Sequence, residues 1–191
     1  MSTDPLRLAV IIGSTRKPRI GEAVADWFVG RCAHRKEFVV DLIDLAEVDL
    51  PAVLPRHAPS PVRSYVARID TADAFVMVTP EYNHGYPASV KQAIDVAGRE
   101  WAAKPVGFVS YGGISGGIRA VEQLRQVFPE VDATTVRRSV AFPKVWGLLD
   151  DHGGLRDSDF AEAAAEQMLD QLVWWGTALR NARHSDTDAA A

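Results

Sequence analysis

Three short segments rich in glycine, hydroxyl and aromatic residues carry the chemistry that this sequence could perform. They are 13–16 (Gly-Ser-Thr-Arg), 80–87 (Pro-Glu-Tyr-Asn-His-Gly-Tyr-Pro) and 111–117 (Tyr-Gly-Gly-Ile-Ser-Gly-Gly). Backbone N–H groups, hydroxyls and a guanidinium bind anions, whereas tyrosine rings and amides contact planar polar molecules. Each segment follows an apolar run that predicts a strand, and loops after parallel strands share one edge of the sheet. We therefore expect one ligand site built from all three segments.

The first segment is a candidate phosphate site. Gly13 is followed by Ser14, Thr15 and Arg16, and a helix is expected to begin near Gly21. Free N–H groups at a helix N-terminus, two hydroxyls and a guanidinium suit a phosphate. The patterns G-x-x-x-x-G-K-[ST] and G-x-G-x-x-G are absent, which disfavours γ-phosphoryl transfer and a dinucleotide pyrophosphate. A single terminal phosphate, as in FMN, fits better, although a plain turn and helix cap would use the same residues.

The second segment is expected to form a stiff wall beside a planar heterocycle. Pro80 and Pro87 restrict the backbone at its two ends, and between them Tyr82 and Asn83 offer ring contact and amide hydrogen bonds. A proline-bounded connection whose tyrosines pack on neighbours is the alternative. His84 is expected to be packed or solvent-facing, and without a second His at metal-ligand spacing no metal site is expected.

The third segment allows two interpretations. Residues 113–117 fit G-x-S-x-G, the nucleophile elbow of α/β-hydrolases, and Asp150, Asp151 and His152 follow in the required order. This reading predicts a serine esterase that uses Ser115. In the alternative, the glycines let exposed N–H groups lie against the edge of a ligand. The short chain favours the alternative. The two other segments favour it as well, because an esterase would not use them.

The elements that must position these segments alternate along the chain. Apolar runs predict strands at 8–12, 38–43, 74–79, 106–110 and about 139–142. Apolar residues at helical spacing predict helices at about 21–32, 62–72, 90–97, 118–128 and 158–181. Right-handed crossovers then give an α/β, three-layer, flavodoxin-like fold with a five-stranded parallel sheet in the order 2-1-3-4-5. We expect residues 182–191 to form a disordered tail.

Composition limits what else the chain can do. Its 191 residues, 47% of them apolar, predict a single domain over 1–191. A net charge of −4 offers no basic surface for nucleic acid, and Cys32 is the sole cysteine, expected to pack in the core. The first residues lack a basic signal region, and the run 8–12 is too short to span a membrane. We expect a cytoplasmic protein with small-molecule partners and neither nucleic-acid nor membrane partners.

Together the three segments resemble those of the NADPH-dependent FMN reductase family. The resemblance also takes in Arg19 and Gly21 after the first segment, Lys91 after the second, and Ile118-Arg119-Ala120 after the third, and it extends over about 8–146. It implies that FMN is held at its phosphate and ribityl chain by Ser14, Thr15, Arg16, Arg19 and Ile20, with Gly21 beside them. It further implies that Pro80, Glu81, Tyr82 and Asn83 line the isoalloxazine ring, and that Ser110, Tyr111, Gly112 and Gly113 close its other edge.

The resemblance also implies an activity. NADPH or NADH would pass a hydride through flavin N5 to free flavin, a quinone, an azo compound or a similar small acceptor, and family members are usually dimers or tetramers. Because the cofactor carries this chemistry, no catalytic side chain is expected. A flavodoxin-type electron carrier without NAD(P)H turnover is the alternative. The mildly acidic composition disfavours it, because a carrier that docks basic partners needs a denser acidic rim.

Overall fold

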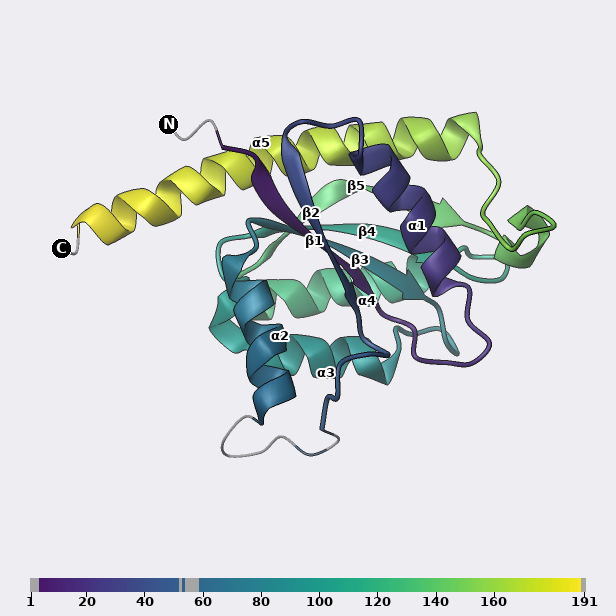
Figure 1. Cartoon of the computed structure of the whole chain (residues 1–191), viewed down its shortest axis with the longest axis horizontal. Helices are drawn as coiled ribbons and strands as arrows, with labels where there is room; N and C mark the ends of the chain where they lie inside the picture. The colour runs from purple at the N-terminus through teal and green to yellow at the C-terminus, as the bar shows by residue number, and fades with distance from the viewer. Residues whose placement is uncertain (1–3, 52, 54–58, 190–191) are drawn as a thin grey trace.

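The computed structural model describes residues 4–51, 53 and 59–189 of the chain. Within these ranges, the chain forms one sheet of five parallel strands in the order β2-β1-β3-β4-β5 (Figure 1). The strands are β1 (Leu6–Ile12), β2 (Phe38–Asp44), β3 (Ala74–Pro80), β4 (Pro105–Tyr111) and β5 (Thr134–Phe142). The flavodoxin-like fold and strand order predicted from the sequence are therefore confirmed.

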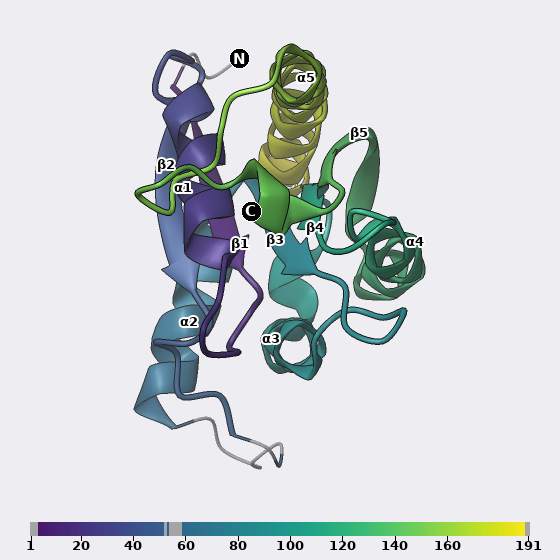
Figure 2. The ribbon, with the colours of Figure 1, turned by 90° about the vertical axis from the view of Figure 1, so that its right-hand side faces the viewer.

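Helices cover both faces of the sheet and complete three layers (Figure 2). One face carries α1 (Gly21–Cys32) and α5 (Asp159–Ala189), and the other carries α2 (Ser60–Thr71), α3 (Ala88–Ala97) and α4 (Ile118–Val127). Short 3-10 turns lie at Gly98–Trp101, Phe128–Val131 and Val145–Leu148. Cys32 is buried under α5, and burial raises the pKa of its thiol to about 12, so it packs as an inert core residue.

The central strands are continuous apolar runs because both of their faces are covered. Side chains alternate along β1: Leu8 and Val10 join the core under α1 and α5, while Ala9 and Ile11 join the core under α2, α3 and α4. All seven residues of β3 and all seven of β4 are buried. The two cores thus fix the register of the sheet, since a shift by one residue would exchange the two sets of side chains.

Two elements differ from the sequence prediction. β5 begins at Thr134 rather than near Ser139, because its first half is a polar edge whose carbonyls accept hydrogen bonds from Arg125 on α4. The final helix does not end near Asn181 but continues to Ala189. The predicted disordered tail from residue 182 onward is therefore wrong for residues 182–189. Arg183 fastens this extension to the body by donating to the Ala103 carbonyl and to Asp73. Residues 190–191 lie outside the described residues.

The order of the strands places the ligand edge. After β1 the chain crosses first to β2 on one side and then to β3 on the other, so the strand order reverses between β1 and β3. Loops that follow β1, β3 and β4 leave the same edge of the sheet, where ligands bind in folds of this kind. These are the loops 13–20, 81–87 and 112–117, which contain the segments that the sequence analysis selected.

Candidate functional site

The three loops meet in one cleft at the carboxyl edge of the sheet. Its volume is about 80 Å³. Loop 13–20 forms one wall, and the ends of β3 and β4 with the residues that follow them form the other. The lining residues are Ser14, Arg16, Pro18, Arg19, Ile20, Pro80, Glu81, Tyr82, Tyr111, Gly112 and Trp146.

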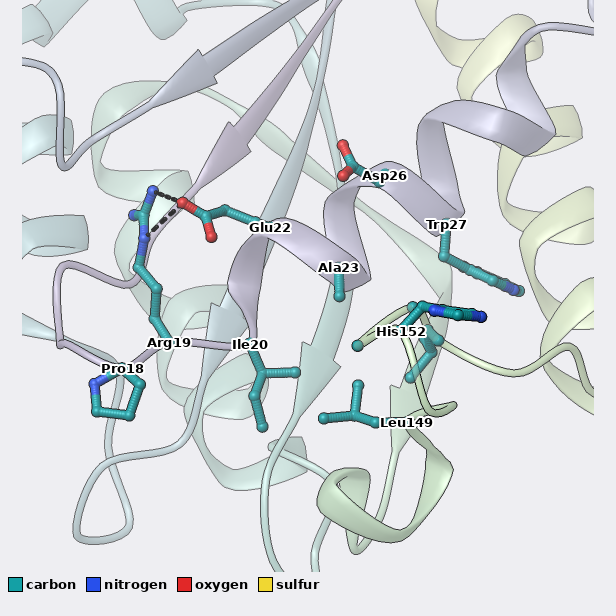
Figure 3. A pocket seen from close by; sticks show the side chains of 12 residues that line it. Pro18, Arg19, Ile20, Glu22, Ala23, Asp26, Trp27, Leu149 and His152 are labelled. Atoms are coloured by element: carbon teal, nitrogen blue, oxygen red, sulfur yellow. Dashed lines mark hydrogen bonds and ion pairs between the residues drawn. The ribbon is translucent and has the colours of Figure 1, made fainter.

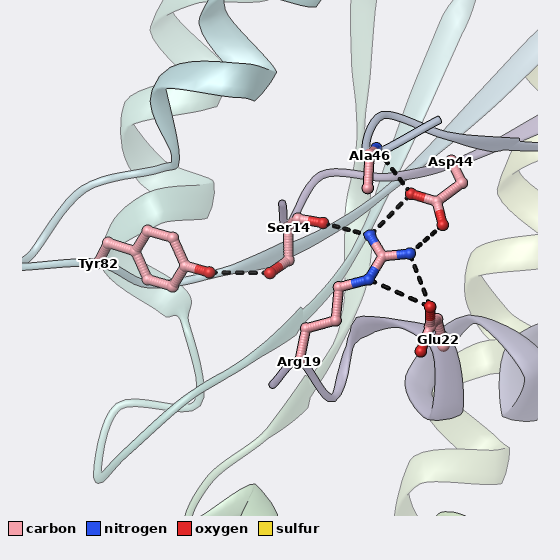
Figure 4. Close-up of polar contacts among 6 residues, drawn as sticks. All are labelled: Ser14, Arg19, Glu22, Asp44, Ala46 and Tyr82. Carbon is pink, nitrogen blue, oxygen red and sulfur yellow. Dashed lines mark hydrogen bonds and ion pairs between the residues drawn. The ribbon is translucent and has the colours of Figure 1, made fainter. Parts of the chain in front are cut away.

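Arg19 holds the first loop in place. Its guanidinium donates to the Ser14 carbonyl at 2.6 Å, and it forms ion pairs with Asp44 at the end of β2 and with Glu22 in the first turn of α1 (Figure 4). The Arg19 and Asp44 side chains are only 9% and 13% exposed. Hydrogen bonds to Asp44 raise the pKa of Arg19 against the opposing effect of burial. The charge of Arg19 is therefore largely compensated within the protein, and its geometry fixes the loop.

Arg16, in contrast, is exposed, and together with Lys17 it carries the remaining positive charge of this loop. No hydrogen bond or ion pair joins it to any part of the chain that the structure describes. It lines the same cleft as Ser14. An anion placed there would meet one uncompensated guanidinium and the N-terminus of α1.

The second loop is a tight turn with two residues at its tip. Tyr82 and Gly85 exchange backbone hydrogen bonds of 2.8 and 3.0 Å, and Asn83 and His84 both have positive φ, at 49° and 71°. This is the type I′ geometry, which tolerates Asn well and His less readily. Arg119 on α4 donates to the His84 ring at 2.6 Å, and Gln123 donates to the His84 carbonyl at 3.0 Å. Contacts with α4 therefore stabilise the turn.

Glu81 ties the second loop to the third. Its carboxylate accepts hydrogen bonds from the Ser115 hydroxyl at 2.8 Å and the Arg119 backbone N–H at 3.2 Å, and it pairs with the Arg119 side chain at 2.8 Å. The side chain is only 8% exposed. A carboxylate beside the first turn of α4 also meets the positive end of the helix dipole. The negative charge of Glu81 is thus satisfied by groups of the protein itself.

These contacts decide between the two interpretations of the third segment. The Ser115 hydroxyl donates to a carboxylate, and no histidine within the described residues forms a hydrogen bond with it. His152 lies instead on the hairpin 149–155, beside α1 (Figure 3). A serine nucleophile needs a base within hydrogen-bond reach. The structure therefore does not support an esterase that uses Ser115.

The backbone N–H groups at the third loop differ in availability. The Gly112 N–H donates to the Phe142 carbonyl at 3.2 Å and is therefore engaged. The Gly113 N–H has no acceptor within the described ranges, and a Cβ built on Gly113 would meet no atom within 4 Å. Of the two glycines, Gly113 is the one whose backbone faces open space. Its φ lies outside the positive region, so turn geometry does not explain the glycine.

The structure gathers most of the residues that the sequence assigned to the cofactor. Those that line the cleft are Ser14, Arg16, Arg19, Ile20, Pro80, Glu81, Tyr82, Tyr111 and Gly112. Thr15, Gly21, Asn83, Ser110 and Gly113 lie next to lining residues in the chain but do not line the cleft themselves. Ser110 is buried, and its hydroxyl donates to the Gly116 carbonyl at 2.8 Å, so its side chain supports the third loop.

Sequence reasoning missed two contributors to this region. Trp146, in the turn after β5, lines the cleft with a side chain that is 66% exposed. Its signal was an aromatic residue after the fifth strand, at the same edge of the sheet as the three loops. Asp44, at the end of β2, is the main partner of Arg19. An acidic residue closing the neighbouring strand could have suggested that pairing.

A second, larger groove lies beside the cleft. It holds about 720 Å³ between α1 and the hairpin 149–155, and it shares Pro18, Arg19 and Ile20 with the cleft (Figure 3). Trp27 and Leu149 form apolar walls, and Glu22, Asp26 and His152 also face it. None of the three segments selected from the sequence contributes a lining residue to this groove.

Comparison with known proteins identifies the class. The model of the NADPH-dependent FMN reductase family matches residues 6–147. NAD(P)H-dependent FMN reductase LOT6 of Saccharomyces cerevisiae is 34% identical over 141 residues, which are 64% of this chain and 73% of that protein. A quinone reductase of Pseudomonas putida is 31% identical over 179 residues, covering 88% of this chain and 93% of that one.

A solved structure gives the same assignment. FerB, a flavoenzyme NAD(P)H:(acceptor) oxidoreductase from Paracoccus denitrificans, superposes with a TM-score of 0.67 at 26% identity, covering 90% of this chain and 97% of that one. The chain belongs to the NADPH-dependent FMN reductase family, whose members are flavin oxidoreductases that use FMN and NAD(P)H. The family and enzyme class predicted from the three segments are confirmed. No helix in the described part of the chain is long and apolar enough to cross a membrane.

Proposed function

We propose that this protein binds FMN in the cleft, oxidises NADPH or NADH, and passes the electrons to free flavin, a quinone, an azo compound or a similar small acceptor. The observation that carries the proposal is the convergence of three loops, each with its family motif, on one cleft. Bound FMN supplies the hydride chemistry. The protein needs to bind and orient FMN, which is consistent with a cleft whose carboxylate, Glu81, is paired internally.

The residues of the cleft fit the cofactor by their chemistry. Ser14, Arg16 and the N-terminus of α1 would hold the phosphate, since hydroxyls, a free guanidinium and backbone N–H groups are the usual donors to phosphate. Thr15 and Ile20 would flank the ribityl chain. Arg19 would act by positioning the loop, because its guanidinium is already paired.

The isoalloxazine ring would lie between the second and third loops. Pro80, Tyr82 and Asn83 would line one side, and Gly112 and Gly113 the other. The free Gly113 N–H would donate to the ring, a role that Gly112 cannot take because Phe142 already accepts its N–H. The cleft is smaller than the roughly 300–1,000 Å³ of typical ligand pockets. Entry of FMN would therefore separate Tyr82 from Ser14, which a single 2.8 Å hydrogen bond joins across the cleft.

The assembly and location of the protein belong to the same proposal. A homodimer or homotetramer in the cytoplasm agrees with the family. Exposed apolar side chains near the cleft, Ile114, Ile118 and Trp146, would suit contact with a second copy.

Two measurements test the function. Purified protein reconstituted with FMN is expected to show a flavin absorption spectrum, and with FMN and menadione it should oxidise NADPH or NADH catalytically. Apoprotein without added flavin is the control. An electron carrier would bind FMN yet show no NAD(P)H turnover, and a protein that binds no FMN would overturn the proposal.

A further inference from the structure

Tyr111 carries a buried hydroxyl that lacks a hydrogen-bond partner among the described residues. The residue ends β4 and is only 5% exposed. Buried phenols usually find a hydrogen-bond partner, because leaving a buried polar group unsatisfied is destabilising. The observation points to a partner that is not part of the protein.

The hydroxyl lies at the N-terminus of α1. A Cβ built on Gly21, the first residue of α1, would stand 2.8 Å from the Tyr111 hydroxyl oxygen and 3.5 Å from the Ser14 Cβ. Only glycine allows this close approach. The residue before the helix, Ile20, makes no side-chain hydrogen bond to cap it. The first N–H groups of a twelve-residue helix are therefore left without a side-chain acceptor beside a hydroxyl that also lacks one.

Ser14 adds a second buried hydroxyl to the same place. It is 2% exposed, and its Oγ lies 2.8 Å from the Tyr82 hydroxyl (Figure 4). Once FMN entry separates Tyr82 from Ser14, the Ser14 hydroxyl can donate to another acceptor at this place.

We propose that the Tyr111 hydroxyl donates a hydrogen bond to the FMN phosphate, beside Ser14 and the first turn of α1, and that it helps the protein prefer FMN to riboflavin. This inference rests on the proposed function and moves Tyr111 from the ring to the phosphate end of the cofactor. The positive end of the α1 dipole favours an anion at this point rather than the edge of a flavin ring. Burial raises the pKa of Tyr111 by more than the neighbouring Ser14 hydroxyl lowers it, so the phenol keeps its proton. Because Arg19 is already paired, hydroxyls and N–H groups would supply more of the hydrogen bonds to the phosphate.

The test compares FMN with riboflavin. Tyr111→Phe removes only the hydroxyl, and fluorescence titration of the apoprotein should show FMN affinity reduced roughly tenfold or more, the usual size for a hydrogen bond to a charged group. Riboflavin affinity should change less than about twofold, since it lacks the phosphate. Thermal unfolding of the Tyr111→Phe apoprotein should occur at the parent's temperature or higher, because an unsatisfied buried hydroxyl is removed. The matched control is Tyr65→Phe, which removes a buried hydroxyl that donates to the Ala93 carbonyl at 3.1 Å on the opposite face.

A second readout uses inorganic phosphate as the probe. Phosphate should raise the melting temperature of the parent and of Tyr65→Phe, and raise that of Tyr111→Phe less. Unchanged FMN affinity in Tyr111→Phe would overturn the proposal, and so would equal losses for FMN and riboflavin, which would place the contact on the ribityl chain or ring. Failure of the proposed function is distinguishable, because the parent protein itself would then bind no FMN.

Discussion

The two loops that face each other across the cleft are both fixed by ion pairs, but the pairs are built differently. In the first loop the cation, Arg19, belongs to the loop, and its main partner, Asp44, closes a neighbouring strand; both side chains are nearly buried. The third loop is held by Glu81, a buried anion of the second loop, whose partner Arg119 at the start of α4 is 39% exposed. Water screens the second pair more than the first. The first pair should therefore matter more for stability.

The comparison also shows which groups remain for a ligand. Charged residues that look in the sequence like ligand contacts, Arg19 and Glu81, are satisfied by other parts of the protein. Arg16, the Tyr111 hydroxyl and the Gly113 N–H have no partner within the described residues. Polar groups of the site are therefore divided between those that shape the cleft and those that can bind within it.

Breaking the first pair should have the largest effect. Asp44→Asn leaves the nearly buried Arg19 guanidinium with Glu22 alone, and Glu22 is 59% exposed. Removing one partner of a buried pair costs about 3–5 kcal/mol. We expect the free energy of unfolding, measured with denaturant at pH 7, to fall by about 3 kcal/mol, near the lower end of this range. Asp41→Asn is the control, because Asp41 lies on the same strand and pairs with Arg68 at half-exposed positions, where such pairs contribute about 0–1 kcal/mol. Equal losses in the two variants would contradict the comparison.

The Arg19–Asp44 pair also predicts how the stability of the protein depends on pH. Burial raises the pKa of Asp44, but hydrogen bonds from Arg19 and the Ala46 N–H, with the charge of Arg19, lower it more, so the net shift is downward from 3.8. A carboxyl with a lowered pKa in the folded state stabilises fully above its unfolded pKa and loses that contribution as pH falls through the folded value. The stability difference between parent and Asp44→Asn should therefore be constant from neutral pH to about 5 and shrink below about 4.

Removing the free cation should change binding rather than stability. Arg16→Ala deletes an exposed side chain that the proposal places on the FMN phosphate, where a charge-assisted bond contributes about 1.5–3 kcal/mol. FMN affinity should fall roughly ten- to hundredfold, with thermal unfolding unchanged. Lys17→Ala, the adjacent exposed cation, should leave affinity within about threefold. An affinity for FMN that Arg16→Ala leaves intact would remove this residue from the site.

Weakening the second pair should have a smaller effect on stability than breaking the first. Glu81→Gln keeps an oxygen that can accept from Ser115 and the Arg119 N–H but loses the charge. Because Arg119 is partly exposed, we expect the free energy of unfolding, measured with denaturant, to fall by about 1–2 kcal/mol. A loss as large as that of Asp44→Asn would show that exposure does not separate the two pairs.

How far the sequence predicts this molecule depends on the range of the contacts. The strand order and the converging loops follow from local apolar runs and the rules of parallel sheets, so they could be predicted. The pairing of Arg19 with Asp44, 25 positions apart, and of Ser14 with Tyr82, 68 apart, depends on tertiary placement that no local pattern encodes. Likewise, the contacts of Arg183 in α5 with Ala103 and Asp73 join positions 80 and 110 apart. Local motifs therefore predict where the candidate site lies, whereas the division of its polar groups depends on tertiary contacts.

The smallest effect is expected at Ser115, where the motif for a nucleophile coincides with a structural hydrogen bond. Its hydroxyl donates to Glu81, which keeps two contacts with Arg119 when the serine is replaced. Ser115→Ala should therefore cost about 1 kcal/mol of stability, the usual net value of one hydrogen bond. NAD(P)H oxidation by the FMN-loaded variant should stay within about threefold of the parent, because the cofactor carries the reaction and no histidine in the described part of the chain bonds to this serine. A variant that binds FMN normally yet loses nearly all turnover would show that the third loop takes part in the chemistry itself. The view that this loop and the Glu81–Arg119 pair only shape the cleft would then be wrong.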